Sequence, residues 1–143
     1  MIAGILLCAG SATRMGFDKL TTPLGGCTAV ERSMALLTLG GCETLVLVTS
    51  EQNEAYIRSL PCAVPTVVVR GGATRTESVR NGLLAAKGAE IAVIHDAARC
   101  FTPAGCVAAC IESAFLAQKL SHLLCVLAML CHSQMECLQS EVQ

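Results

Sequence analysis

The stretch 2-IAGILLCAGSATRMGFDK-19 joins an uninterrupted apolar run to a polar loop. Residues 2–8 show no polar alternation, which is typical of a strand covered on both faces. The loop that follows places Gly10, Arg14 and Lys19 at the end of this strand. A turn at the glycine presents N–H groups, and the two cations neutralise oxyanions, so the loop favours binding of a triphosphate. Taken alone, it is equally compatible with a solvated surface turn.

This loop matches neither of two common nucleotide-binding motifs. It lacks the Gly-Lys-Ser/Thr ending of a P-loop, and Ala12 occupies the second glycine position of the GxGxxG dinucleotide motif. The choice between a triphosphate-binding loop and a solvated surface turn therefore depends on the rest of the chain.

Three further aliphatic runs, residues 44–49, 66–69 and 91–95, predict buried strands. Helical spacing is found at residues 30–39, 52–60, 75–86 and 104–120. This alternation of strand and helix predicts one α/β domain with a mostly parallel sheet and helices on both faces. Because no strand is predicted after residue 95, we expect the sheet to be incomplete at its C-terminal end and to expose a hydrophobic edge.

The composition narrows the class of ligand and the compartment. The 143 residues carry a net charge of -1, which gives no basic surface for nucleic acid or acidic membranes. The ten cysteines include no CxxC pair, and residues 1–8 lack the basic start of a signal peptide, so a reducing cytoplasm is expected. Cys106 and Cys110, one helical turn apart, are interpreted as packing residues. The apolar run 123–131 is too short to cross a bilayer.

Two more loops follow strands and share the sheet edge where α/β domains bind ligands. In 70-RGGATRTESVRNGL-83, paired Gly71 and Gly72 permit close approach to a ligand, and Thr74 or Thr76 is expected to cap the next helix. A plain strand-to-helix connection is the alternative.

The third loop, 94-IHDAAR-99, ends the last predicted strand. Asp96 is placed to hold Mg²⁺ or a ribose hydroxyl, and Arg99 to meet a second anionic substrate. An Asp96–Arg99 ion pair that only orders the loop is the alternative. His95 is interpreted as a packed structural residue rather than a base.

Together, 9-AGSATRMGFDK-19, 71-GGATRTESVRNGL-83 and 95-HDAAR-99 resemble the 2-C-methyl-D-erythritol 4-phosphate cytidylyltransferases of the non-mevalonate isoprenoid pathway. The first motif is shared by many nucleotidyltransferases, and related pentitol-phosphate cytidylyltransferases remain an alternative. The resemblance implies a Rossmann-like nucleotidyltransferase fold, with transfer of CMP from CTP to the polyol phosphate and release of pyrophosphate. It also implies Mg²⁺ as cofactor and a homodimer.

The resemblance also implies residue roles. Arg14 and Lys19 would stabilise the transition state, and Asp96 and Arg99 would bind the acceptor, with Asp96 also near the metal. Nucleotide binding would fall to Ala9, Gly10, Ser11, Gly72, Arg75 and Ser78. The chain departs from the family pattern at Cys8, Ala12, Ala73 and Cys100, and Ala73 leaves the choice of base open.

The motif resemblance ends near residue 114, which divides the chain into a nucleotide-binding part, 1–114, and a divergent tail, 115–143. The tail lacks the family's dimerisation arm, which argues against a homodimer. It also lacks further substrate-binding residues of the family, including another arginine and lysine, which predicts impaired turnover. A reading-frame change is one explanation for the divergent tail, because codons CAC AGT CAA ATG for residues 132–135 contain Thr-Val-Lys in a shifted frame.

Two functions are the alternatives to CMP transfer to 2-C-methyl-D-erythritol 4-phosphate. The chain is then either a non-catalytic nucleotide-binding remnant or an enzyme acting on another polyol phosphate. No metal cluster is expected among the tail's histidines and cysteines, His122, Cys125, Cys131, His132 and Cys137.

Overall fold

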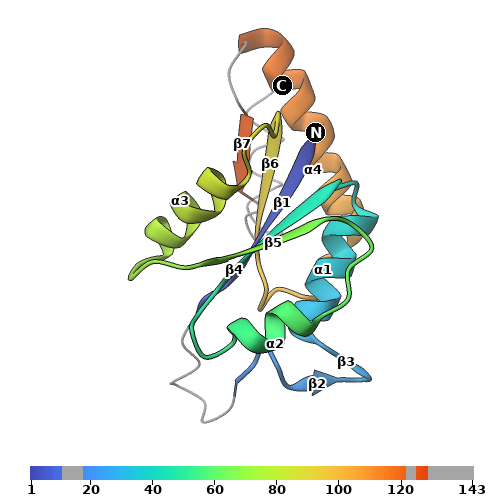
Figure 1. The fold of residues 1–143 in the computed structure, drawn as a ribbon. Coiled ribbons are helices and arrows are strands. Elements are labelled where there is room, and N and C mark those ends of the chain that lie inside the picture. The colour runs from blue at the N-terminus through green and yellow to red at the C-terminus, as the bar shows by residue number, and fades with distance from the viewer. Residues whose placement is uncertain (11–17, 122–124, 129–143) are drawn as a thin grey trace.

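A five-stranded parallel sheet forms the centre of the computed structural model, which describes residues 1–10, 18–121 and 125–128 (Figure 1). The strands are β1 Ile2–Cys8, β4 Thr44–Thr49, β5 Thr66–Arg70, β6 Ile91–Asp96 and β7 Cys125–Ala128. Their spatial order is β5-β4-β1-β6-β7, and every pair is parallel. The chain therefore builds outward from β1 to β5 and then crosses back to β6. The loops after β1 and β6 diverge at this reversal, which is where α/β sheets bind ligands.

The fifth strand corrects the expectation that the sheet ends after the fourth. β7 pairs with β6 from Ile91 opposite Cys125 to Ile94 opposite Ala128, so the expected open edge along β6 is paired. The strand lies in a continuous apolar run, and periodicity alone does not separate a short buried strand from a helix in such a run.

Four helices cover the two faces of the sheet. They are α1 Ala29–Leu39, α2 Glu54–Ser59, α3 Arg75–Ala85 and α4 Ala104–Ser121. α1, α2 and α4 share one core cluster with the sheet, and α3 packs on the opposite face (Figure 1). The prediction of an α/β domain with helices on both faces is confirmed. No helix among the described residues is both long and apolar enough to span a membrane.

A small hairpin was missed by the sequence interpretation. β2, Pro23–Leu24, pairs antiparallel with β3, Cys27–Thr28. The turn between them uses Gly25 and Gly26 at φ 66° and 96°, a left-handed conformation that favours glycine. The Gly-Gly pair was the available signal, because two residues of this type between short strands are typical of a tight hairpin.

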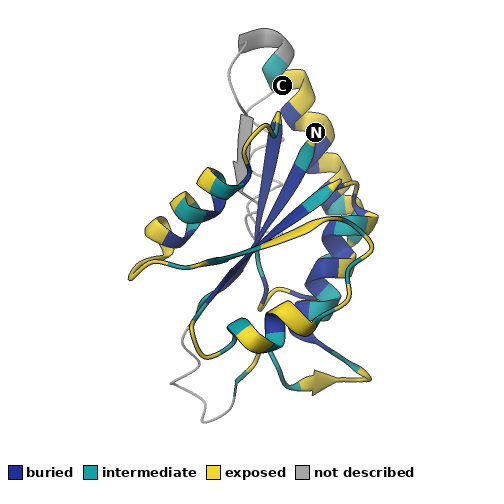
Figure 2. Cartoon of the chain, in the orientation of Figure 1, coloured by how far each residue is buried: buried dark blue, intermediate teal, exposed yellow. Residues whose placement is uncertain are grey.

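Burial on both faces explains the absence of polar alternation in β1. Leu6 and Cys8 point into the core beneath α1 and α4, whereas Ile5 and Leu7 point into the core beneath α3. The interior strands are accordingly buried along most of their length (Figure 2). Each fully buried aliphatic side chain contributes about 1.5–3 kcal/mol to folding.

The approach of α3 to the sheet depends on a glycine. A Cβ on Gly82 would lie 2.5 Å from Ile5 Cγ2, closer than side chains tolerate, and 3.1 Å from Val48 Cγ2, a tight contact. Gly82 thus lets the helix backbone rest directly on β1 and β4. This contact sets how far the first turn of α3, with Arg75 and Ser78, stands from the ends of the strands.

Candidate active site

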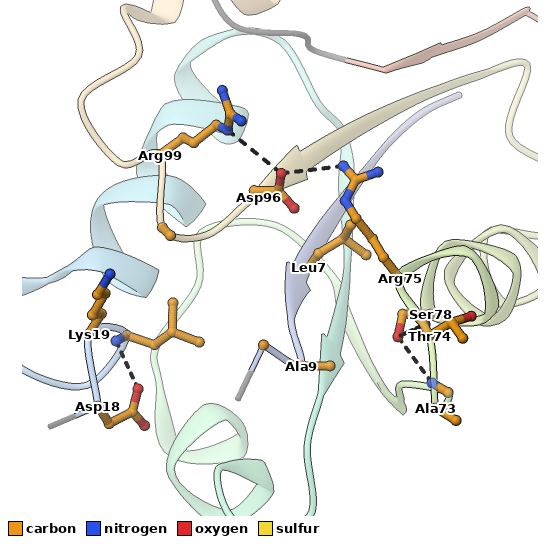
Figure 3. Close-up of a pocket in the computed structure, with 14 residues that line it drawn as sticks. Leu7, Ala9, Asp18, Lys19, Ala73, Thr74, Arg75, Ser78, Asp96 and Arg99 are labelled. Carbon is orange, nitrogen blue, oxygen red and sulfur yellow. Dashed lines mark hydrogen bonds and ion pairs between the residues drawn. The ribbon is translucent and has the colours of Figure 1, made fainter. Parts of the chain in front are cut away.

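A cavity of about 600 Å³ opens at the carboxyl ends of β1 and β6, in the size range of small-molecule sites (Figure 3). All predicted site residues that the structure describes line it, together with residues the sequence interpretation had not assigned. Ser11 and Arg14 lie outside the described residues, so their roles stay predictions. The lining residues are Leu7, Ala9, Gly10, Asp18, Lys19, Leu20, Gly72, Ala73, Thr74, Arg75, Ser78, Asp96, Ala98 and Arg99.

The start of α3 is fixed by a capping box. Thr74 Oγ1 accepts from the backbone N–H of Glu77 at 3.1 Å, as the sequence predicted for Thr74 or Thr76. Glu77 Oε2 in turn accepts from the backbone N–H groups of Ala73, at 2.7 Å, and Thr74, at 3.2 Å. The turn at the cavity wall is therefore held by the helix that follows it.

Ser78 fixes the same turn from inside. Its Oγ accepts from the N–H of Gly72 and donates to the carbonyl of Thr74, both at 3.0 Å, and the side chain is 5% exposed. The Gly72 N–H is thus engaged within the protein rather than presented to the cavity. Ser78 acts as a brace beneath the wall of the cavity.

The paired glycines are required by the protein's own packing. A Cβ on Gly71 would lie 2.6 Å from the Cβ of Ala9, and a Cβ on Gly72 would lie 2.2 Å from the Cβ of Glu77. Protein atoms thus occupy the space that side chains would need, while close approach of a ligand to Gly72, which lines the cavity, stays a prediction. Gly71 brings the loops after β5 and β1 together.

The turn expected after Gly10 falls on residues 11–17, outside the described part of the chain, so it stays a prediction. Gly10 does not adopt a left-handed φ, unlike Gly25 and Gly26, and a Cβ on it would have no described atom within 4 Å. The residue therefore leaves open space beside the end of β1, where it lines the cavity.

Asp96 stands between two arginines from different loops. Its Oδ2 accepts from Arg75 Nη2 at 3.3 Å and lies 3.7 Å from Arg99 Nε (Figure 3). The Asp96–Arg99 ion pair considered from sequence is present, and the pair with Arg75 adds a link from the first residue of α3. All three side chains are partly exposed, so each pair is worth well under 1 kcal/mol after solvent screening.

The charges of the cavity favour an anion. Lys19, Arg75 and Arg99 line it against the carboxylates of Asp18 and Asp96, which leaves a positive excess. Asp18 was missed as a cavity residue, although it directly precedes Lys19. Its Oδ1 accepts from the backbone N–H of Leu20 at 2.9 Å and so fixes the turn that carries the lysine.

The described residues hold no cluster of three or more histidine, cysteine, aspartate or glutamate side chains suited to a metal ion. The cavity nevertheless offers two carboxylates, Asp18 and Asp96. Mg²⁺ is usually held by one or two carboxylates plus substrate phosphates, so this donor set fits a metal that arrives with a phosphate ligand.

His95 and Cys8 lie outside the cavity chemistry. His95 is 1% exposed, and neither ring nitrogen makes a hydrogen bond of standard geometry to a described residue. Burial lowers its pKa, while the Arg99 backbone and the Asp96 carboxylate oppose the shift. Burial, reinforced by Asp18, raises the pKa of the Cys8 thiol to about 12, so this cysteine stays protonated. The burial of His95 agrees with its interpretation from the sequence as a packed structural residue.

Comparison with known proteins gives one family. The family model described as 2-C-methyl-D-erythritol 4-phosphate cytidylyltransferase matches residues 2–131, a range that passes residue 114 and includes β7. The 2-C-methyl-D-erythritol 4-phosphate cytidylyltransferase of Rhodococcus jostii (strain RHA1) is 35% identical over 114 residues, 78% of this chain and 50% of that protein. The bifunctional enzyme IspD/IspF of Anaeromyxobacter sp. (strain Fw109-5) is 36% identical over 116 residues, 79% of this chain and 30% of that protein.

A solved structure supports the fold. The 4-diphosphocytidyl-2C-methyl-D-erythritol synthase of Anaerococcus prevotii DSM 20548 superposes with a TM-score of 0.63 at 22% identity, covering 82% of this chain and 51% of that chain. The chain thus spans half or less of the length of these two curated relatives and about half of this structure.

Proposed function

Because the chain belongs to the 2-C-methyl-D-erythritol 4-phosphate cytidylyltransferase family, we propose that its cavity transfers CMP from CTP to 2-C-methyl-D-erythritol 4-phosphate. The observation that carries this proposal is the convergence of Lys19, Arg75 and Arg99 on one cavity at the reversal of the sheet. These cations come from three loops far apart in sequence. Their meeting suits a reaction that joins two phosphate-bearing substrates.

The nucleotide is proposed to lie between the loops after β1 and β5. The open space at Gly10 gives room for its phosphates beside Ala9, and the braced turn at Gly72 and Ser78 forms the opposite wall. Arg75, the first residue of α3, adds a guanidinium at this wall. Ser11 and Arg14 complete the proposed nucleotide and catalytic set as predictions from sequence.

The proposed chemistry is a displacement at the α-phosphorus. A phosphate oxygen of the acceptor forms the new P–O bond while the bond to the bridging oxygen of the β-phosphate breaks, and pyrophosphate leaves with that oxygen. Negative charge spreads over the transferred group, so catalysis depends on positioning and cations rather than on a protein nucleophile. Lys19, exposed at the cavity, and Arg14 are the proposed transition-state cations.

Mg²⁺ is the proposed cofactor and would arrive with CTP. Asp96 is the proposed metal residue, with Asp18 as a second carboxylate in the same cavity. The metal would neutralise phosphate charge. In the described structure Arg75 and Arg99 hold Asp96 through weak, partly exposed pairs that an arriving phosphate is able to replace.

The acceptor is proposed to bind on the β6 side of the cavity. Arg99 there supplies a planar fork that suits the phosphate of a polyol phosphate. Another polyol phosphate remains the alternative acceptor. A reducing cytoplasm is the proposed location, since Cys8 and Cys42 are buried in the core as thiols. A homodimer is expected from the family and opposed by the divergent tail, so oligomeric state remains a prediction.

Pyrophosphate release tests the proposal. The wild-type chain is mixed with CTP, Mg²⁺ and 2-C-methyl-D-erythritol 4-phosphate, and a second reaction replaces the acceptor with another pentitol phosphate. Release that requires the first acceptor and is abolished by Lys19→Ala supports the proposed reaction. Release only with the second acceptor would support the alternative substrate. CTP binding with no release from either would support the non-catalytic alternative.

A further inference from the structure

The loop that carries Arg99 is anchored from behind by α1. This loop, residues 97–102, runs from the end of β6 past the N-terminal part of α1 toward α4 (Figure 1). Ser33 of α1 is fully buried, and its Oγ donates to the carbonyl of Ala97 at 3.0 Å. The Ala97 N–H donates to the carbonyl of Leu7 in β1 at 3.1 Å. Both polar groups of the Ala97 backbone are therefore bonded to the body of the fold.

Local hydrogen-bonded turns connect Ala97 to Arg99. The Arg99 N–H donates to the carbonyl of Asp96 at 3.0 Å. Its carbonyl accepts from the N–H of Thr102 at 3.3 Å and from Thr102 Oγ1 at 3.0 Å. These bonds lie within the loop and do not attach it to other elements. The hydrogen bonds of Ala97 attach its start to α1 and β1, and the Cys100 side chain is buried further along.

The neighbour of Ser33 makes a second tie to the same loop. The guanidinium carbon of Arg32 lies 5.5 Å from the ring centre of Phe101, and its Nη2 donates to the carbonyl of Leu24 at 2.7 Å. Phe101 is 74% exposed, so the arginine is the neighbour that holds this end of the loop against α1. Two consecutive residues of one helix thus contact the loop at both ends.

We propose that Ser33 is a positioning residue for the acceptor arginine: its hydroxyl fixes Ala97 and thereby places Arg99 in the cavity. This inference rests on the proposed cytidylyltransferase function. Ser33 does not line the cavity and acts only through Ala97. Without the hydroxyl, the Ala97 carbonyl is buried and unpaired, so the loop shifts to regain a partner. A shift on the order of 1 Å is enough to impair a reaction that depends on positioning.

The effect is expected on one substrate only. Arg99 is assigned to the acceptor. The nucleotide wall at Gly72 and Ser78 is formed by the turn before α3 and the first turn of α3, and this helix covers the other face of the sheet. Ser33→Ala should therefore raise KM for the polyol phosphate about 5- to 10-fold, the factor that matches the loss of about one net hydrogen bond. KM for CTP should change less than about twofold.

Thr38→Ala is the matched control on the same helix. Thr38 Oγ1 donates to the carbonyl of Met34 at 2.9 Å, a contact within α1 that does not touch the loop. This variant removes a hydroxyl and a hydrogen bond from α1 but leaves Ala97 paired. Both KM values should stay at the wild-type level.

The experiment combines kinetics with hydrogen exchange in the ligand-free full chain. Wild type, Ser33→Ala and Thr38→Ala are compared in KM for each substrate and in exchange of the amides of residues 97–102. We expect a raised acceptor KM and faster exchange in Ser33→Ala alone. Equal increases in both KM values, or a result identical to Thr38→Ala, would overturn the inference.

Absence of turnover in the wild type would count against the proposed function rather than against this inference. Exchange then decides: unchanged protection of residues 97–102 in Ser33→Ala overturns the anchoring role. If Ser33→Ala does not fold, Ser33→Cys replaces it, because a thiol fills the same space but is a weaker donor to the Ala97 carbonyl. The same selective rise in acceptor KM and faster exchange of residues 97–102 are expected, and their absence contradicts the inference.

Discussion

Ser78→Ala should weaken both the fold and nucleotide binding, because Ser78 braces the wall of the cavity. Its hydroxyl accepts from Gly72 N–H and donates to Thr74 C=O, each at 3.0 Å. Alanine leaves the Gly72 N–H without its acceptor, whereas the Thr74 carbonyl loses one of two donors and keeps the backbone N–H of Ser78 at 3.0 Å. The turn over residues 71–74 keeps its bonds to Glu77 but loses those to the Ser78 hydroxyl.

The magnitude follows from these two bonds. Each contributes about 0.5–1.5 kcal/mol net, so their loss costs about 1–3 kcal/mol. Alanine is the better helix former by about 0.5 kcal/mol, which offsets part of that loss. The unfolding free energy should fall by about 0.5–2.5 kcal/mol after this offset.

Urea denaturation measures this change, with Thr76→Ala as the matched control. Thr76 is exposed in the same turn of α3, so its replacement gains helix propensity without removing the brace. Calorimetric titration of Mg-CTP should show weaker binding to Ser78→Ala than to Thr76→Ala. A Ser78→Ala protein as stable as Thr76→Ala, with the same affinity for CTP, would refute the role of Ser78 as a brace.

Three further predictions test the packing, the charges and the thiols. Gly82→Ala should be less stable than Gly105→Ala by about 1–3 kcal/mol in urea, because a Cβ at Gly82 would lie 2.5 Å from a strand side chain whereas one at Gly105 would meet nothing within 4 Å. Asp96→Asn should bind metal-free pyrophosphate more tightly, because the change frees Arg75 and Arg99 from their carboxylate partner. The same variant should bind CTP in the presence of Mg²⁺ more weakly. If calorimetry shows no change in either affinity, the role of Asp96 is contradicted. The free energy of unfolding should fall as pH rises from about 9 toward 12, because the thiols of Cys8 and Cys42 have pKa values of about 12 in the folded state and near 9.0 in the unfolded state. Denaturation titrations should show a smaller fall for the double variant with alanine at both positions.

The strands were predictable because their apolar runs end at polar residues. β1 and β4 match the predicted ranges, and β5 and β6 each extend one residue further, to Arg70 and Asp96. Those two polar residues stand at the ligand-facing ends of parallel strands. Apolar periodicity therefore located the sheet edge, and with it the loops that form the cavity.

Elements without a distinctive period were not predictable in the same way. β7 lies in a long apolar run, and the two-residue strands of the hairpin are too short to show alternation. α2 is shorter than predicted and starts at Glu54, where Asn53 makes no side-chain cap. Local pattern does not report which segments pair across the fold.

Long-range contacts account for the missed features of the cavity. Arg75 and Asp96 are 21 residues apart and meet only because α3 and β6 start and end at the same sheet edge. Ser33 and Ala97 are 64 residues apart, and nothing in either neighbourhood of the sequence indicates their bond. The sequence patterns identified the chemical groups, whereas the pairing of those groups depends on packing.

Calorimetric titration of Mg-CTP into the ligand-free protein tests the central claim most directly, namely that the cavity binds a nucleoside triphosphate. Lys19 lines the cavity, and Lys87, which is exposed and follows α3, does not, so Lys19→Ala and Lys87→Ala form a matched pair. We predict that wild type and Lys87→Ala bind Mg-CTP equally and that Lys19→Ala binds far more weakly. Equal binding by all three proteins, or binding by none, would contradict the claim.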